Sequence, residues 1–260
     1  MPSPAESTGA LVIVGIGPGS LEQMTARALK EIAGSDIVIG NDTYLDQLEP
    51  LLTGKNVIRS SMGKEVERAK TAIRLAQKRR VAIVSGGDAG VYGMAGIVLE
   101  VLEHEKAEIP VEIVPGVTAA NAAAARVGSP LSGDFAVISL SDLLTPIDII
   151  EKRLEAVFSV GIPVVIYNPK SRGRPHNLSG AISIARKYLD ADTPIALVRD
   201  AYREGEKITI TTVRDVEKYY TDVDMHTTVI IGGSESRIWR RGSDVKGIIT
   251  PRGYHRKYVY

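Results

Sequence analysis

The 260-residue sequence contains no cysteine and few histidines. Without cysteine the chain has no disulfide, no thiolate metal site and no cysteine nucleophile, and this composition favours a cytoplasmic location. Histidine occurs four times and never at the paired spacing of a metal site. We therefore expect a cytoplasmic protein with no resident metal.

Long apolar runs and an excess of one charge are also missing. No apolar run approaches the roughly 18 residues of a membrane span, and Met1–Gly9 lacks the basic and apolar regions of a signal peptide. The formal net charge of +1 gives no reason to expect a nucleic-acid binder. With 44% hydrophobic and 24% charged residues, the composition is that of a soluble globular protein. We expect no membrane or nucleic-acid partner.

Short β-branched runs alternate with helix-like segments in the first half of the chain. Strands are predicted at residues 11–16, 36–39, 81–85 and 111–114, and helices at 21–33, 64–78 and 94–105. This order is typical of an α/β fold with an open, mostly parallel sheet.

The pattern restarts after Pro130 with more strands than helices. Strands are predicted at residues 135–140, 163–167, 195–199, 207–212 and 227–231, and helices at 147–157, 178–189 and 213–219. This excess of strands over connecting helices predicts a mixed sheet in the second half. An alanine-rich helix within 115–128 joins the halves, so we divide the chain into α/β domains at 1–120 and 121–260.

A glycine-rich turn, SGGDAGVYG at Ser85–Gly93, follows the buried strand at 81–85. Gly86 and Gly87 tolerate positive φ and allow a ligand to lie against the backbone. Asp88 places a carboxylate at the edge where open parallel sheets bind ligands. The pattern predicts a ligand-binding turn.

The loop GIGPGS at Gly15–Ser20 follows the first strand but is not a dinucleotide fingerprint. The third glycine of that fingerprint would fall at Ser20, and Pro18 lacks the amide that a pyrophosphate would use. A tight turn without any ligand is the alternative interpretation.

Several other polar residues have both a functional and a structural interpretation. Asp42 in GNDTYL is a candidate for proton transfer or a helix N-cap, and Thr118 could equally be an N-cap. Arg172 and Arg174 lie in the basic loop YNPKSRGRPH, which could simply be solvated. His226, before a buried strand, is either a ligand contact or a structural histidine.

Seven motifs taken together resemble the tetrapyrrole methylase family. They are GIGPG, GNDTYL, SGGDAGVYG, PGVTAANAAAA, SLSDLLTP at 139–146, YNPKSRGR, and TPRGY at 250–254. The resemblance runs from about Leu11 to Tyr254 and covers almost the whole chain.

The resemblance implies two α/β domains, S-adenosylmethionine in the cleft between them, and a homodimer. Motif positions imply that the following residues contact the cofactor: Pro18, Gly87, Asp88, Val91, Tyr92, Thr118, Ala119, Asn168, Ala201, His226 and Thr227. Asp88 is expected near the sulfonium and the amino-acid end. Many relatives have GDP where this chain has Gly87-Asp88-Ala89, which leaves the loop conformation open.

Three of the motifs, SLSDLLTP, YNPKSRGR and TPRGY, narrow the implied activity to methylation of carbon 17 of a precorrin-3B-type tetrapyrrole, with ring contraction, in cobalamin biosynthesis. Asp42, Arg172 and Arg174 are the expected substrate contacts, and no catalytic acid or base is assigned. Part of the basic segment 237–260 is expected to bind the carboxylate arms of the substrate together with these arginines, and a solvated tail is the alternative interpretation of this segment. The alternatives are a sibling methylase acting at another macrocycle carbon and a tetrapyrrole-binding protein without activity.

Overall fold

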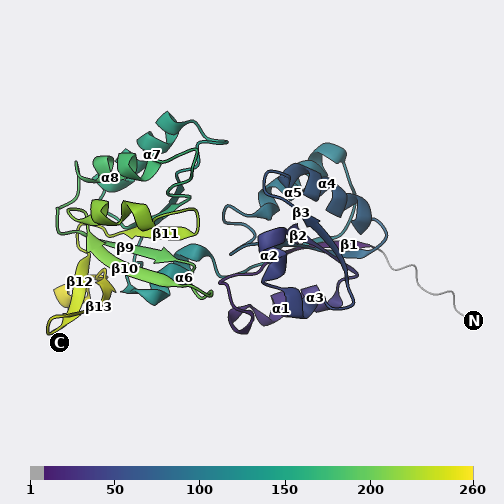
Figure 1. Ribbon diagram of the computed structural model, residues 1–260, viewed down its shortest axis with the longest axis horizontal. Helices are drawn as coiled ribbons and strands as arrows, with labels where there is room; N and C mark the ends of the chain where they lie inside the picture. Colours follow the sequence, from purple (N-terminus) through teal and green to yellow (C-terminus); the bar gives the residue numbers. More distant parts are fainter. Residues whose placement is uncertain (1–8, 260) are drawn as a thin grey trace, which may run out of the picture. The chain divides into compact units, whose positions relative to one another are not determined.

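The structure of the protein is a computed structural model that describes residues 9–259. It divides into two compact units, the first ending at Ala119 and the second beginning at Ala120 (Figure 1). The expectation that Met1–Gly9 is not a signal peptide concerns mostly residues 1–8, which lie outside the described residues. Among the described helices, none combines the length and the apolar character that crossing a membrane requires.

The first unit is built on a parallel sheet of five strands in the order β3-β2-β4-β1-β5. The strands are β1 (Ala10–Gly15), β2 (Ile37–Asn41), β3 (Asn56–Ser60), β4 (Arg80–Ser85) and β5 (Val111–Val114). Since all five run in the same direction, their carboxyl ends lie at one edge, which we call the carboxyl edge of the parallel sheet.

Helices cover both faces of this sheet, α4 and α5 on one side and α1 and α3 on the other (Figure 1). The elements are η1 (Leu21–Gln23), α1 (Ala26–Gly34), α2 (Asp42–Asp46), α3 (Glu49–Leu52), α4 (Glu65–Ala76) and α5 (Met94–Glu105). Leu11 and Ile13 of β1 enter one buried cluster, whereas Val12 and Val14 enter the other. The two-residue alternation of a strand thus supplies two cores.

The second unit contains a mixed sheet in the order β10-β9-β11-β8-β7. Its strands are β7 (Ala136–Ser139), β8 (Val164–Tyr167), β9 (Pro194–Arg199), β10 (Lys207–Thr212) and β11 (Thr227–Ile231). β7 and β8 are parallel, and β11 is antiparallel to both β8 and β9. The carboxyl ends of β7, β8 and β9 therefore share one edge, the carboxyl edge of the mixed sheet.

Helices again cover both faces of the mixed sheet, α7 and α8 on one side and α6 on the other (Figure 1). The elements are α6 (Ala119–Arg126), α7 (Ile147–Ser159), α8 (Asn177–Ala185), η2 (Val216–Asp222) and η3 (Tyr254–Arg256). Phe158 and Leu154 of α7 pack in the larger cluster, and Ala120 and Ala123 of α6 pack in the smaller one. The alanines allow this short helix to lie close to the sheet.

A small third sheet, β12-β13-β6, completes the second unit. It joins the hairpin of β12 (Arg237–Arg241) and β13 (Asp244–Ile249) to β6 (Gly128–Ser129), which directly follows α6. The predicted fold class, two α/β domains with a parallel sheet and then a mixed one, is confirmed. The predicted helix at 213–219 is wrong in type and position, because a 3-10 helix occupies 216–222.

Candidate functional site

Three loops meet at the carboxyl edge of the parallel sheet because β4, β1 and β5 are consecutive neighbours. Beyond the ends of β1 and β4, the Ile16 amide donates to the Ser85 carbonyl at 2.9 Å. The Gly17 amide donates to the Gly87 carbonyl, also at 2.9 Å. The turn that the sequence singled out is therefore paired by its backbone with the GIGPG loop.

The backbones of these three loops touch at four glycines, Gly15, Gly17, Gly87 and Gly116, which we call the glycine junction. A Cβ on Gly15 would lie 2.6 Å from the Gly116 nitrogen, and a Cβ on Gly17 would overlap the Val117 carbonyl. Gly87 differs, because its φ is +63° and the nearest atoms to a Cβ there are 3.7 Å away. The junction is closed at Gly15 and Gly17, whereas space remains above Gly87.

Asp88 connects two of these loops. Its Oδ1 accepts from the Gly90 amide at 2.8 Å, and its Oδ2 accepts from the Gly116 amide at 3.0 Å. The residue is half-buried, and each carboxylate oxygen has a further lone pair for a ligand. Asp88 therefore has a structural role in this loop and still presents a negative charge.

The remaining predicted cofactor residues of the first unit lie close to the glycine junction in the sequence. Pro18 is buried and follows a cis peptide bond, while Thr118 and Ala119 are half-buried. Val91 and Tyr92 are 37% and 60% exposed, and Tyr92 has a φ of +52°. Backbone strain of this kind is found more often at ligand-binding turns than elsewhere.

Asp42 lies at the same edge, after β2, but it is not the helix N-cap. The cap of α2 is Asn41, whose side chain accepts from the Thr43 amide at 2.9 Å. Asp42 is the first residue within the helix, half exposed, with Oδ1 3.8 Å from Arg59 Nη1. The N-cap interpretation of Asp42 is therefore wrong by one position.

Most of the non-glycine residues with positive φ are predicted cofactor residues or their immediate neighbours in the sequence. Five such residues occur in the described part of the chain, and one of them, Lys106, is the C-cap of α5. The others are Tyr92, Asn168, Asp200 and Tyr202. The last two flank the predicted residue Ala201. Residues held in this region cost free energy, and such strain clusters at functional sites.

Asn168 and His226 both lie at the carboxyl edge of the mixed sheet. The Asn168 side-chain amide donates to Ser139 Oγ at 2.8 Å, across the ends of β8 and β7. His226 Nδ1 lies 3.3 Å from Asp200 Oδ1, with half of the imidazole exposed. Thr227 is buried and its hydroxyl is used in a turn with Asp224, as both donor and acceptor at 3.2 Å.

Sequence reasoning missed the cluster that holds the turn around Ala201. Glu206 accepts from Arg126 at 2.9 and 2.8 Å and from the Tyr202 amide at 3.0 Å, and the guanidinium lies 5.1 Å from the Tyr202 ring centroid. Burial raises the pKa of Glu206, but the hydrogen bonds from Arg126 and Tyr202 and the charge of Arg126 outweigh it and hold the pKa below its usual value. No local sequence signal links Arg126 to Glu206, since 80 positions separate them.

The two predicted substrate arginines have different environments. Arg174 Nη1 donates to Ser141 Oγ at 2.8 Å and lies 3.4 Å from Asp142 Oδ1, so it joins the loop after β8 to the loop after β7. Arg172 is exposed, and its side chain has no hydrogen bond or ion pair to other residues within 9–259. Arg172 therefore has its whole guanidinium available to a ligand, whereas Arg174 already uses its Nη1 within the fold.

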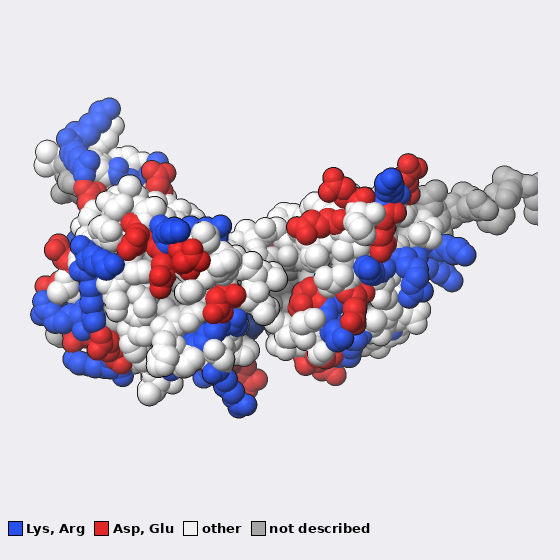
Figure 2. Space-filling model, turned by 90° about the horizontal axis from the view of Figure 1, so that it is seen from above, with Lys and Arg blue, Asp and Glu red and all other residues white. Residues whose placement is uncertain are grey.

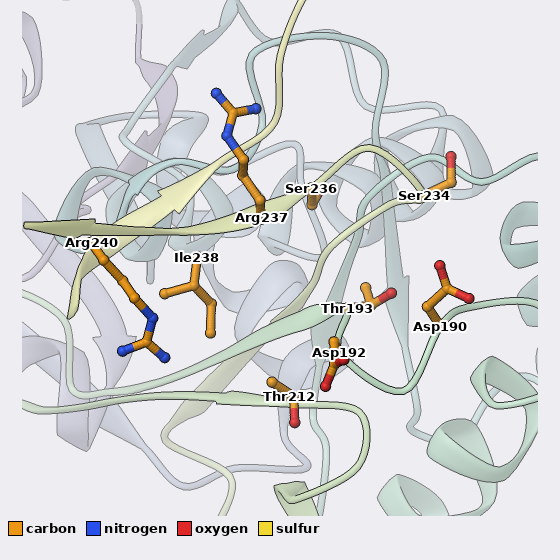
Figure 3. A pocket seen from close by; sticks show the side chains of 9 residues that line it. All are labelled: Asp190, Asp192, Thr193, Thr212, Ser234, Ser236, Arg237, Ile238 and Arg240. Carbon is orange, nitrogen blue, oxygen red and sulfur yellow. The ribbon is translucent and has the colours of Figure 1, made fainter. Parts of the chain in front are cut away.

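The first basic residues of the segment 237–260, Arg237 and Arg240, do not lie beside Arg172 and Arg174. Arg237 and Arg240 line an open pocket of about 400 Å³ with Thr193 and Asp190 (Figure 3). Thr193 precedes β9, so this pocket lies at the opposite edge of the mixed sheet, about 20 Å from the carboxyl edge for a six-residue strand. Figure 2 shows Lys and Arg interspersed with acidic residues on this unit, and Arg256 pairs with Glu235.

Comparison with known proteins identifies the family. Residues 10–217 match the family model described as Tetrapyrrole (Corrin/Porphyrin) Methylases. The chain belongs to the tetrapyrrole methylase family. Membership implies S-adenosylmethionine as the methyl donor at the level of the family.

Individual members of this family align with nearly the whole chain. "Cobalamin biosynthesis protein CbiHC" of Archaeoglobus fulgidus is 44% identical over 97% of this chain, which spans only 54% of that longer protein. The "Probable cobalt-factor III C(17)-methyltransferase" of Salmonella typhimurium is 42% identical over 94% of this chain and 99% of its own length. The solved structure of the methyltransferase CobJ has a TM-score of 0.86 and 32% identity, with 94% of this chain and 100% of that chain covered.

Proposed function

We propose that this tetrapyrrole methylase transfers a methyl group from S-adenosylmethionine to carbon 17 of a precorrin-3B-type tetrapyrrole, with ring contraction, in cobalamin biosynthesis. The observation that carries this proposal is the 42% identity to the Salmonella typhimurium protein over nearly the full length of both chains. The SLSDLLTP, YNPKSRGR and TPRGY motifs support the same assignment.

The residues at the carboxyl edge of the parallel sheet fit the cofactor. S-adenosylmethionine has a cationic sulfonium and an ammonium group, and the Asp88 carboxylate offers the opposite charge. The space above Gly87 allows close approach to the backbone, since a Cβ there would have no neighbour within 3.7 Å. The proposed contacts are Pro18, Gly87, Asp88, Val91, Tyr92, Thr118, Ala119, Asn168, Ala201, His226 and Thr227.

The chain's own contribution to methyl transfer is mainly positioning. When bound, S-adenosylmethionine supplies a sulfonium-activated methyl group, and a partly reduced tetrapyrrole supplies a nucleophilic carbon. The protein must align the two and exclude water. Ring contraction also needs proton transfer, and Asp42 is a candidate because its half-exposed carboxylate lies at the same sheet edge as Asp88. Asp42 and the two arginines, Arg172 and Arg174, are the proposed substrate contacts.

We further propose a cytoplasmic homodimer, on the basis of the family resemblance. Light scattering of the purified protein coupled to gel filtration tests the dimer directly. A mass of twice 27.9 kDa is expected, whereas a single-chain mass at working concentration contradicts it.

The activity test follows the methyl group into the product. The protein is incubated with ¹³C-methyl S-adenosylmethionine and, in separate arms, metal-free precorrin-3B and cobalt-factor III. Enrichment at carbon 17, with the meso carbon excluded from the contracted ring, is expected in at least one arm. Enrichment at another carbon identifies a sibling methylase, and no S-adenosylhomocysteine in either arm contradicts an enzymatic role.

The cofactor site is tested by replacing Asp88. Calorimetry should show one S-adenosylhomocysteine site per chain, and Asp88→Ala should weaken binding by about 1–3 kcal/mol because a polar contact in a desolvated site is lost. Asp88→Asn is the matched variant, since it keeps an acceptor for one of the two amides while removing the charge. Wild-type affinity in both folded variants would remove Asp88 from the site.

A further inference from the structure

Two adjacent leucines are almost fully exposed in the loop between β7 and α7. Leu143 is 77% exposed and Leu144 is 94% exposed, and we call them the leucine pair. Ile147, the first residue of α7, is also 42% exposed. Isolated exposed apolar residues are common, whereas contiguous ones indicate a contact surface.

The exposure of the leucine pair does not result from a loosely held loop. On one side of the pair, the Ser141 amide donates to Ser139 Oγ at 3.2 Å, and Asn177 Nδ2 donates to the Leu140 carbonyl at 2.7 Å. Leu140 itself is buried, as is Ile150 of α7. The fold therefore holds the loop at both ends and leaves the leucine pair exposed between them.

The loop also lies beside residues already implicated in binding. Asn168, a proposed cofactor contact, donates to Ser139 at the base of the loop. Arg174 links Ser141 to the loop that contains the exposed Arg172. Asp142, the acidic residue next to the leucine pair, lies 3.4 Å from Arg174, so its charge is partly balanced.

An apolar loop joined to a loop with a free guanidinium matches a particular kind of molecule. A tetrapyrrole macrocycle has a broad, largely apolar face and a rim of acetate and propionate arms. Apolar side chains can cover such a face, and a guanidinium can bind a carboxylate with two hydrogen bonds. The combination of Leu143, Leu144 and Arg172 has both components.

We propose that the leucine pair forms an apolar surface against the macrocycle face of the tetrapyrrole, while Arg172 binds one of its carboxylate arms. The pair thereby determines specificity for a macrocycle over smaller methyl acceptors. Arg174 acts as a positioning residue that holds the two loops together. This inference rests on the proposed function, because it assigns the substrate surface of that same site.

The test replaces both leucines and measures tetrapyrrole binding separately from turnover. In the double variant Leu143→Ser, Leu144→Ser, the KM for the tetrapyrrole should rise about tenfold or more, since burial of one leucine side chain already corresponds to a factor of that size. The Kd for S-adenosylhomocysteine should stay within twofold. Leu99→Ser is the matched control, because Leu99 is a 45% exposed leucine on α5.

Binding of uroporphyrin is followed by fluorescence anisotropy. Because this measurement does not depend on methyl transfer, it tests the leucine pair separately from the proposed function. If no methyl transfer to carbon 17 is found, weaker uroporphyrin binding in the double variant still supports the leucine pair as a tetrapyrrole surface. Unchanged KM and uroporphyrin affinity would overturn it. A halved molecular mass with wild-type tetrapyrrole binding would also overturn it and assign the pair to contact between copies of the chain.

Arg172→Gln provides the second arm. It should raise the KM severalfold at low salt, and the difference from wild type should shrink as salt screens the ion pair. Arg172→Lys should recover part of the loss, because the charge returns without the planar fork. Equal KM values for wild type and Arg172→Gln at low salt would remove Arg172 from the substrate surface.

Discussion

The loops at the carboxyl edges of the two sheets are held together in different ways. The carboxyl edge of the parallel sheet is held by backbone packed against backbone, with Gly15, Gly17 and Gly116 in contact. The carboxyl edge of the mixed sheet is held by side-chain pairs such as Asn168 with Ser139 and Arg126 with Glu206. The first edge therefore has no room for an added Cβ at these three glycines, whereas the second should respond to substitution in graded steps.

The largest effect is expected for Gly17→Ala in the glycine junction. A Cβ there would overlap the Val117 carbonyl and lie 2.7 Å from Gly87 Cα, and neither backbone atom can move without shifting a loop. We expect a loss of at least about 2 kcal/mol in unfolding free energy, together with loss of S-adenosylhomocysteine binding. Urea denaturation and calorimetry measure the two effects.

Gly96→Ala is the control for this variant. Gly96 is an exposed position within α5, and a Cβ there would have no neighbour within 4 Å. Alanine should stabilise the helix by up to about 1 kcal/mol. Equal unfolding free energies for Gly17→Ala and Gly96→Ala would show that the carboxyl edge of the parallel sheet can accept an added Cβ, which contradicts the proposed difference between the two edges.

Asn168 provides an intermediate effect at the other edge. Asn168→Gly removes the hydrogen bond to Ser139 but keeps a residue that tolerates the φ of +52°. Asn168→Val removes the hydrogen bond and also forces a β-branched residue into the left-handed region. Valine should therefore be less stable than glycine by roughly 1–2 kcal/mol, as measured by urea denaturation. Equal stability of the two variants would show that the backbone relaxes at this position.

The smallest expected effect is a pH dependence of stability that arises from Glu206. Because the pKa of Glu206 lies below its usual value in the fold, its ionised form stabilises the native state. The contribution is present above the ordinary glutamate pKa of about 4.3 and is lost as the pH falls through the lowered pKa. With Arg126 partly exposed, we expect less than about 1 kcal/mol.

The measurement compares the Tm of the wild type and of Glu206→Gln from pH 7 down to the most acidic pH at which both proteins are still folded. The wild type should be the more stable at pH 7, and the gap should close as the pH drops below about 4. A gap that is independent of pH would mean that the carboxylate charge does not hold the Tyr202 turn.

The periodicity of the sequence predicted most of the fold. Leu11–Val14 and Val81–Val84 are continuous apolar runs because both faces of the parallel sheet are covered by helices, and this made the central strands readily identifiable. β3 was missed, since it is an edge strand with exposed and half-buried residues and lacks such a run. β12 and β13 were missed for the same reason, because their arginines and lysine indicated a charged surface.

The candidate site was predictable only where one loop carries the chemistry. The turn at Ser85–Gly93 was identified because its glycines and Asp88 are contiguous in sequence. The link from Asp88 to Gly116 joins residues 28 positions apart. The turn with positive φ at Asp200 and Tyr202 is bound by the Arg126–Glu206 cluster, which local sequence does not reveal.

The small β12-β13-β6 sheet affects the order in which the chain can fold as it is synthesised. All five strands of the first unit have been made by Val114, so its sheet can form while the rest is still being translated. In the second unit, Thr250 Oγ1 donates to the Pro130 carbonyl at 2.6 Å across 120 positions. β6 likewise pairs with β13, Gly128 opposite Ile248, so the second unit can complete its third sheet only after its last strand has been synthesised.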